Sequence, residues 1–112
     1  MTLNLIMSKF ELPATLIIVG KTYTVQYDPN IHGAAFGRML GNKQLILVDP
    51  DQIKECEQDT LLHECIHAID FQLQIGLKEQ QVNNLATGLI MLLKQNPVFT
   101  GYLLDILEKP FE

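Results

Sequence analysis

Residues 44–76, QLILVDPDQIKECEQDTLLHECIHAIDFQLQIG, contain the change from strand-like to helix-like sequence that decides the fold. The run QLILVD is the most apolar strand candidate in the chain, and it ends at Asp49-Pro50. A long helix is expected directly after it, from about Gln52 to Gln74, because Gly76 is a natural C-terminal breaker. The stretch therefore separates a β-rich first half from a helical second half.

The sequence before this stretch has the composition of β-strands. Residues 14–28, ATLIIVGKTYTVQYD, form two runs rich in Val, Ile, Thr and Tyr around Gly20-Lys21, a pair suited to a type II′ hairpin turn. Residues 29–40, PNIHGAAFGRML, begin as a loop and are expected to end in a third strand. Gly41-Asn42-Lys43 then turns the chain into QLILVD.

The sequence after Pro50 is typical of helices. Asp49 or Asp51 can cap the first helix, with Pro50 close to its start. A second helix is expected from about Lys78 to Gln95, ended by Asn96-Pro97, because its apolar residues recur at helical spacing: Val82, Leu85, Ala86, Leu89 and Leu93. A short third helix is expected near Thr100 to Leu107. The order predicts a single α+β domain over residues 1–112, with a small antiparallel sheet of three or four strands followed by two long helices and a short C-terminal helix.

Composition restricts the class of partner. The chain has 112 residues and a net charge of −5, with 8 Lys and Arg against 13 Asp and Glu. Because nucleic acids and anionic membranes require a concentrated basic surface, neither is an expected partner. No apolar run approaches the roughly 20 residues that span a bilayer. The N-terminus, MTLNLIMSKFELP, has no basic region or small-residue cleavage site, so no signal peptide is expected. These features predict a cytoplasmic protein.

The two cysteines are not expected to pair. On one helix, Cys56 and Cys65 would be about 13.5 Å apart along the axis and on opposite faces. This fits a reducing compartment. Cys65 points away from the neighbouring His63, which favours a role as a small core residue over a role as ligand or nucleophile.

The motif His63-Glu64-x-x-His67 carries the chemistry of the chain. Residues at i and i+4 of a helix share one face, so both imidazoles can reach a single ion, and zinc accepts neutral imidazole nitrogen. Glu64 lies about 100° round the helix, where a general base could take a proton from a zinc-bound water. The alternative is a pair of buried core histidines, but burying three ionisable groups without a partner is costly. The motif therefore predicts a catalytic site with one zinc ion.

A third protein ligand is expected outside the motif. The extended pattern HExxHxxGxxH is absent, because Asp70 stands where the Gly would be and Leu73 where the last His would be. Glu79, in the first turn of the next helix, is the better candidate, since His₂Glu sites are common for catalytic zinc. It could also simply be an acidic residue favourably placed at a helix N-terminus.

Several residues are candidates for supporting roles. Asp70 could accept the free N–H of a liganding imidazole or be a solvated helix residue, and Asn83 could orient a ligand. A tetrahedral intermediate also needs a donor for its oxyanion. The candidates are Tyr102, His32, Tyr27 and Arg38. Tyr102 could equally be a packing residue, and His32 an ordinary loop histidine.

The strand before the catalytic helix could bind substrate. If LILVD is an edge strand above the cleft, a peptide could add to it as a further strand. The alternative is a central core strand, which its unbroken apolar run also suits.

The chain resembles a minimal zincin metallopeptidase. The order of strands, HExxH helix and Glu-bearing helix is similar to the gluzincin arrangement. EQQVNNLATGL resembles the segment that follows HExxH in ImmA/IrrE-like metallopeptidases, although Gln80 and Gln81 replace acidic residues usual there. QLILVDP, TLLHECIHAID and LATGLIMLLKQNP also resemble small HExxH proteins of phages and prophages. The resemblance covers about residues 36–97 and implies His63, His67 and Glu79 as zinc ligands and Glu64 as catalytic base.

Three functions fit these features. The first is a zinc-dependent endopeptidase acting on a specific protein substrate, in the host cytoplasm if the protein is phage-encoded. The second is a metal-stabilised binding or inhibitor module without peptidase activity. The third is a hydrolase with the same zinc-water chemistry on another bond. Glu64 favours an enzyme, because a structural metal site has no need of a base beside the ion.

Overall fold

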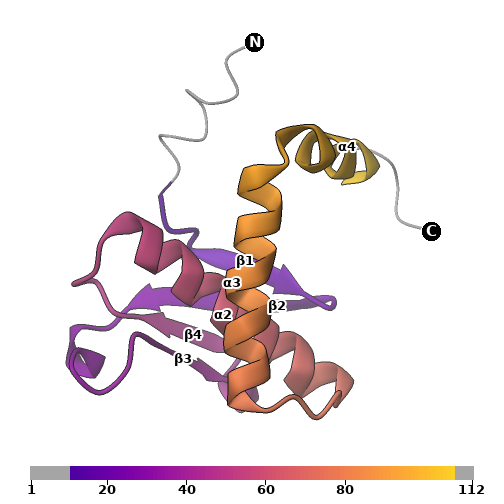
Figure 1. Cartoon of the computed structure of the whole chain (residues 1–112). Helices are drawn as coiled ribbons and strands as arrows, with labels where there is room; N and C mark the ends of the chain where they lie inside the picture. Colours follow the sequence, from indigo (N-terminus) through magenta and orange to yellow (C-terminus); the bar gives the residue numbers. More distant parts are fainter. Residues whose placement is uncertain (1–10, 108–112) are drawn as a thin grey trace.

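The computed structural model describes residues 11–107 and has an α+β fold, which confirms the predicted class (Figure 1). The absence of a signal peptide was predicted from residues 1–13, and residues 1–10 lie outside the described part of the chain. Four strands and two short 3-10 turns come first, and three helices follow. Their bounds are β1 Thr15–Ile18, β2 Lys21–Tyr27, η1 Pro29–Ile31, β3 Gly37–Leu40, η2 Gly41–Lys43, β4 Leu45–Val48, α2 Lys54–Leu73, α3 Glu79–Gln95 and α4 Pro97–Leu107.

The sheet is mixed, whereas an antiparallel sheet was expected. Its strand order is β1-β2-β4-β3, with β1 antiparallel to β2, β3 antiparallel to β4, and β2 parallel to β4. After β2 the chain passes through η1 and a loop to the edge of the sheet, forms β3 there, and returns as β4 between β3 and β2. Because β4 reverses the direction of β3, it enters the sheet parallel to β2.

The hairpin between β1 and β2 is present, but its turn differs from the expected one. Ile18 pairs with Lys21, so the two turn residues are Val19 and Gly20. Their φ angles are both positive, 49° at Val19 and 78° at Gly20. Two positive φ angles are the requirement of a type I′ turn and not of type II′. This turn twists in the same sense as the strands, and Gly20 adopts its conformation without a steric cost.

The strand β4 lies in the centre of the sheet, so of the two alternatives left open for it the edge strand is excluded. Its residues Ile46 and Val48 are fully buried, in agreement with the alternative of a core strand. They pack with Tyr23 and Val25 of β2 and with Ala68 of α2. Burial of these side chains supplies the main hydrophobic stabilisation of the sheet–helix layer. The exposed edge next to the helices is β3.

The helix α2 lies across one face of the sheet, with α3 packed on its other side (Figure 1). Its residue Cys65 packs against the sheet core, as predicted, and burial raises the pKa of the thiol to about 11. Cys56 on the opposite face is exposed, and both thiols are free. On the side of α3, Ile66 packs with Val82 and Ala86.

The start of α2 is not capped as expected. Its N-cap residue is Ile53, which has no capping side chain. The Asp49 carboxylate instead accepts hydrogen bonds from the Asp51 N–H at 2.9 Å and from the His32 ring at 2.8 Å. Because Asp49 is held in this turn, the helix begins only after a further bend of the chain. None of the helices within residues 11–107 is long and apolar enough to cross a membrane.

Candidate metal centre

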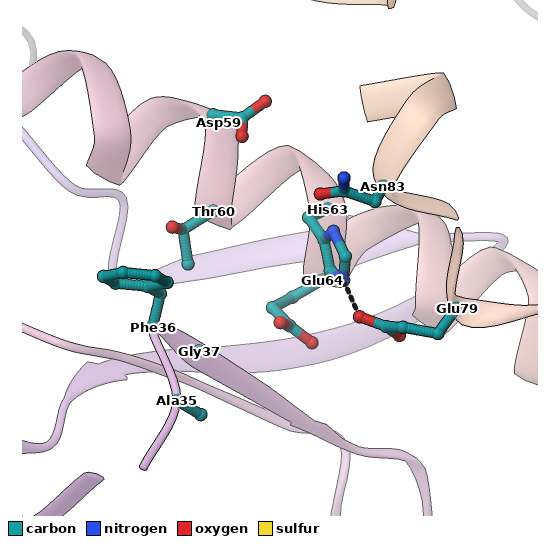
Figure 2. A pocket seen from close by; sticks show the side chains of 9 residues that line it. All are labelled: Ala35, Phe36, Gly37, Asp59, Thr60, His63, Glu64, Glu79 and Asn83. Atoms are coloured by element: carbon teal, nitrogen blue, oxygen red, sulfur yellow. Dashed lines mark ion pairs between the residues drawn. The ribbon is translucent and has the colours of Figure 1, made fainter. Parts of the chain in front are cut away.

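The two histidines of the motif converge on one carboxylate. His63 and His67 lie one turn apart on α2, with ring centroids separated by 4.9 Å. Glu79, the first residue of α3, places its Oε2 atom 3.0 Å from His63 Nε2 and its Oε1 atom 2.7 Å from His67 Nε2. Figure 2 shows the ion pair between His63 and Glu79. The reversal of the chain after α2 thus brings a residue twelve positions downstream onto the histidine face.

The chemistry of these donors fits a divalent metal ion. One ligand atom from each of His63, His67 and Glu79 lies within 4.8 Å of the other two. Two imidazole nitrogens and one carboxylate oxygen make the His₂Glu donor set of catalytic zinc sites, in which a fourth position stays open. The Glu79 side chain is 71% exposed, so the carboxylate has room to make way for an ion between it and the rings.

Glu64 lies beside these donors and is buried. Its residue exposure is only 6%, and its carboxylate points into the cleft toward the Glu79 side (Figure 2). Burial, followed by the nearby charge of Glu79, raises the pKa of Glu64 from its ordinary value of 4.5 to about 7. A carboxyl group with a pKa near neutrality is suited to accept and return a proton.

A cleft runs past the donors between α2, α3 and the edge of the sheet. A cavity of about 290 Å³ is bounded by residues 35–37 before and at the start of β3, by Asp59 and Thr60 of α2 and by Asn83 of α3. His63, Glu64 and Glu79 also line it (Figure 2). A second hollow of similar size follows β3 itself, from Gly37 to Leu40, and reaches His67. The donors therefore lie in the middle of an open groove along an edge strand.

Gly37 allows the close approach of β3 to α2. A Cβ atom at this position would lie 2.7 Å from Thr60 Cγ2 and 3.1 Å from both Cγ and Oε2 of Glu64. Contacts at these distances would force a neighbour to shift. The absence of a side chain at Gly37 therefore provides the space in which the Glu64 carboxylate lies.

Asp70 does not bind an imidazole, and it is not a merely solvated residue. Its Oδ1 atom accepts hydrogen bonds from the backbone N–H groups of Gly76 at 2.8 Å and Leu77 at 3.0 Å. Both donors belong to the connection between α2 and α3. The Asp70 side chain therefore holds the backbone of residues 76 and 77, just before Glu79, against the end of α2.

Of the other residues considered for supporting roles, Asn83 and Arg38 lie along the cleft and Tyr102 does not. Asn83 lines the cleft near His63, although within residues 11–107 it makes no hydrogen bond to a donor residue. Arg38 lies on β3 along the second hollow. Tyr102 lies away from the cleft, contrary to expectation: it is on α4, 66% exposed, in a hollow formed by residues 95–99. The whole length of α3, from Glu79 to Gln95, separates α4 from the metal donors.

His32 and Tyr27 also lie outside the cleft, contrary to the expectation that either could stabilise an oxyanion. The His32 Nδ1 atom is 2.8 Å from Asp49 Oδ2, and its Nε2 atom is 3.3 Å from Asp51 Oδ2. The hydrogen bond to Asp49 raises the pKa of His32. The Tyr27 hydroxyl donates to Glu57 Oε1 at 2.7 Å, which raises the pKa of the tyrosine to about 12. Both side chains serve contacts that hold the fold.

Five residues that line the cleft were not identified from the sequence: Ala35, Phe36, Gly37, Asp59 and Thr60. Two of them carried a usable signal, because Asp59 and Thr60 precede His63 by four and three positions and so share its helix face. A glycine within a strand also indicates close approach of another segment, which applies to Gly37. Ala35 and Phe36 carried no such signal.

No protein-family model, curated protein or solved structure matches this chain. Its chemistry is therefore interpreted from the geometry of the site.

Proposed function

We propose that the protein is a zinc-dependent endopeptidase that hydrolyses a peptide bond of a specific protein substrate. The observation that carries the proposal is the convergence of His63, His67 and Glu79 next to a buried carboxyl group, Glu64, in an open cleft. The resemblance to zincins agrees with it, and so does the donor set, which is common in hydrolytic zinc sites.

The residues of the site have distinct roles in this reaction. His63, His67 and Glu79 would hold the ion, which lowers the pKa of water and polarises a carbonyl group. Glu64 takes the proton from the attacking water and returns it to the leaving amine. Burial raises its pKa to about 7 in the metal-free chain, so this carboxyl group holds a proton more readily than an exposed glutamate does.

The exposed strand β3 supports a peptide as the substrate. β3 pairs only with β4 among the described strands, so its outer edge offers backbone N–H and C=O groups to a further strand. A peptide added there would run along the groove from Phe36 to Leu40, past Glu64. The same role was one of two alternatives for β4, which lies in the centre of the sheet and has no free edge.

Metal content and cleavage together test the proposal. Purified protein should contain one equivalent of zinc by mass spectrometry, Glu64→Gln should retain it, and His63→Ala should lose it. Incubated with a library of proteome-derived peptides, wild type should produce new termini and Glu64→Gln should not. Glu55→Gln, which removes an exposed carboxylate of the same helix, is the matched control and should behave as wild type.

Two outcomes would contradict the proposal in different ways. If no zinc co-purifies and none binds at micromolar concentration, the metal site itself is wrong. If zinc binds but neither peptides nor folded proteins are cleaved, the second candidate, a metal-stabilised binding module, takes its place. That candidate draws on the fact that the donors come from two helices, so an ion would tie α2 to α3.

A further inference from the structure

The connection between α2 and α3 sets the position of the proposed third ligand. Gln74 ends α2 with a φ of 52°, and Gly76 has a φ of 89°, so the chain reverses within a few residues. Glu79 follows three positions after Gly76 as the first residue of α3. Its side chain is largely exposed, so little packing holds the carboxylate in place. Its location therefore depends on the backbone that precedes it.

Two features of this connection are fixed by local contacts. Leu77 packs against the cluster of Ile66, Val82 and Ala86 between the helices. The Lys78 N–H donates to the Gln81 side chain at 2.8 Å, which caps the start of α3. The Leu77 contact reaches α2 at Ile66, beside His67, but it is apolar and has no fixed direction, and the Lys78 contact lies within α3.

Asp70 adds a directional tie between the turn and α2. One carboxylate oxygen, Oδ1, accepts from two consecutive N–H groups of the turn, at Gly76 and Leu77. Asp70 follows His67 by three positions on the same helix, so the turn is anchored directly to the element that carries both histidines. Hydrogen bonds to an ionised acceptor are stronger than neutral ones, and a two-fold contact also fixes direction.

We propose that Asp70 is a positioning residue for the metal site: by holding Gly76 and Leu77 against α2, it sets Glu79 at the distance at which all three donors can share one ion. The inference rests on the proposed metal site. It assigns Asp70 no contact with metal or substrate, and its effect passes through the backbone to Glu79 alone.

The test measures zinc affinity by competition with a chromophoric chelator. Asp70→Ala should weaken zinc binding on the order of tenfold to a hundredfold, the usual effect of removing a group that orients a ligand. Asp70→Asn retains an Oδ1 acceptor for both N–H groups and should recover most of the affinity. Asp70→Ser, whose side chain is too short to reach the turn, should repeat the loss and provides a second variant if Asp70→Ala folds poorly.

A double-mutant cycle separates positioning from a general loss of structure. In a Glu79→Ala background, Asp70→Ala should weaken zinc binding little further, because the ligand that it positions is already gone. The control is Gln72→Ala. This variant removes two hydrogen bonds from α2 to Ile18 O and Tyr23 Oη, and it should lower the free energy of unfolding while zinc affinity stays unchanged.

These measurements test the role of Asp70 and the presence of the metal site separately. Unchanged affinity in Asp70→Ala, or an equal loss with and without Glu79, overturns the role of Asp70 while the metal site stands. Failure of the wild-type protein to bind zinc overturns the proposed function, and the role of Asp70 with it, before any variant is compared.

Discussion

Glu64 is placed at a cost to the stability of the metal-free protein. Its pKa is about 7 in the folded chain against 4.5 ordinarily. Between pH 4.5 and about pH 7, the folded state therefore keeps a proton on Glu64 that the unfolded state has lost. Stability therefore falls as the pH rises from 4.5 to about 7. Glu64→Gln should remove this dependence and raise the free energy of unfolding above neutral pH by up to about 3 kcal/mol.

Urea denaturation of the metal-free protein at pH 5 and pH 8 measures this effect. Glu79→Gln is a useful companion, because the charge of Glu79 is the second cause of the raised pKa and its removal should reduce the pH dependence only in part. Equal pH dependence in wild type and Glu64→Gln would show that Glu64 is ionised in the folded chain without penalty.

At the scale of elements, the separation of β3 from α2 is set by Gly37. Gly37→Ala would place a methyl group against Thr60 and Glu64. We expect a loss of about 1–3 kcal/mol in the free energy of unfolding as the strand or the Glu64 side chain is displaced. Peptidase activity should fall with it, since the base moves. Denaturation and cleavage assays on the same preparation measure both.

Gly88 provides the matched control for this prediction. It lies within α3, and a Cβ atom there would meet nothing within 4 Å. Gly88→Ala should therefore leave activity unchanged and stabilise the protein by up to about 1 kcal/mol, because alanine favours a helix. If Gly37→Ala is as harmless as Gly88→Ala, the close approach of β3 has no role in holding Glu64.

The elements themselves were predictable, because each carries a local pattern. The helical periodicity and the breakers at Gly76 and Pro97 located the helices to within about three residues. The strand order was not predictable, since the pairing of β2 with β4 depends on contacts far apart in the sequence. The edge strand was not predictable either, because an apolar run such as residues 45–48 is compatible with a position at the centre or at the edge of a sheet.

The part of the candidate site that lies on one helix was predictable from the spacing of its residues in the sequence. His63, Glu64 and His67 share their element, so their relation follows from helix geometry alone. The approach of Glu79 was inferred from the break at Gly76, and the structure brings it within 3.0 Å of both histidines. The positions of Tyr102 and His32 were not predictable, because tertiary structure decides their contacts. The contacts of Asp70 were not predictable, because its partners are backbone groups that no side-chain pattern reveals.

For the whole molecule, a metal ion would link stability to binding. The donors come from α2 and α3, whose mutual packing involves few fully buried side chains, chiefly Ile66, Val82 and Ala86. An ion that binds only the folded state adds about 2.7 kcal/mol to the free energy of unfolding at a free concentration of a hundred times its Kd. Zinc should therefore raise the Tm in wild type and Glu64→Gln.

Differential scanning calorimetry with zinc and then with excess EDTA measures this stabilisation. His63→Ala should show no increase in Tm, because it lacks one of the three donors. A Tm that is the same with and without zinc in wild type, under conditions where the metal is bound, would mean that the ion binds the unfolded chain equally well.

The short reversal between α2 and α3 has a consequence for how such a protein can change over generations. Both histidines, the proposed base Glu64, the carboxylate of Asp70 and the proposed third donor Glu79 all lie within residues 63–79. One short stretch of the chain, residues 63–79, therefore contains the proposed reactive groups together with the bend that brings them together. A single recombination event would transfer or delete them as a unit, and an insertion in the bend would separate Glu79 from the histidines without altering any of the three.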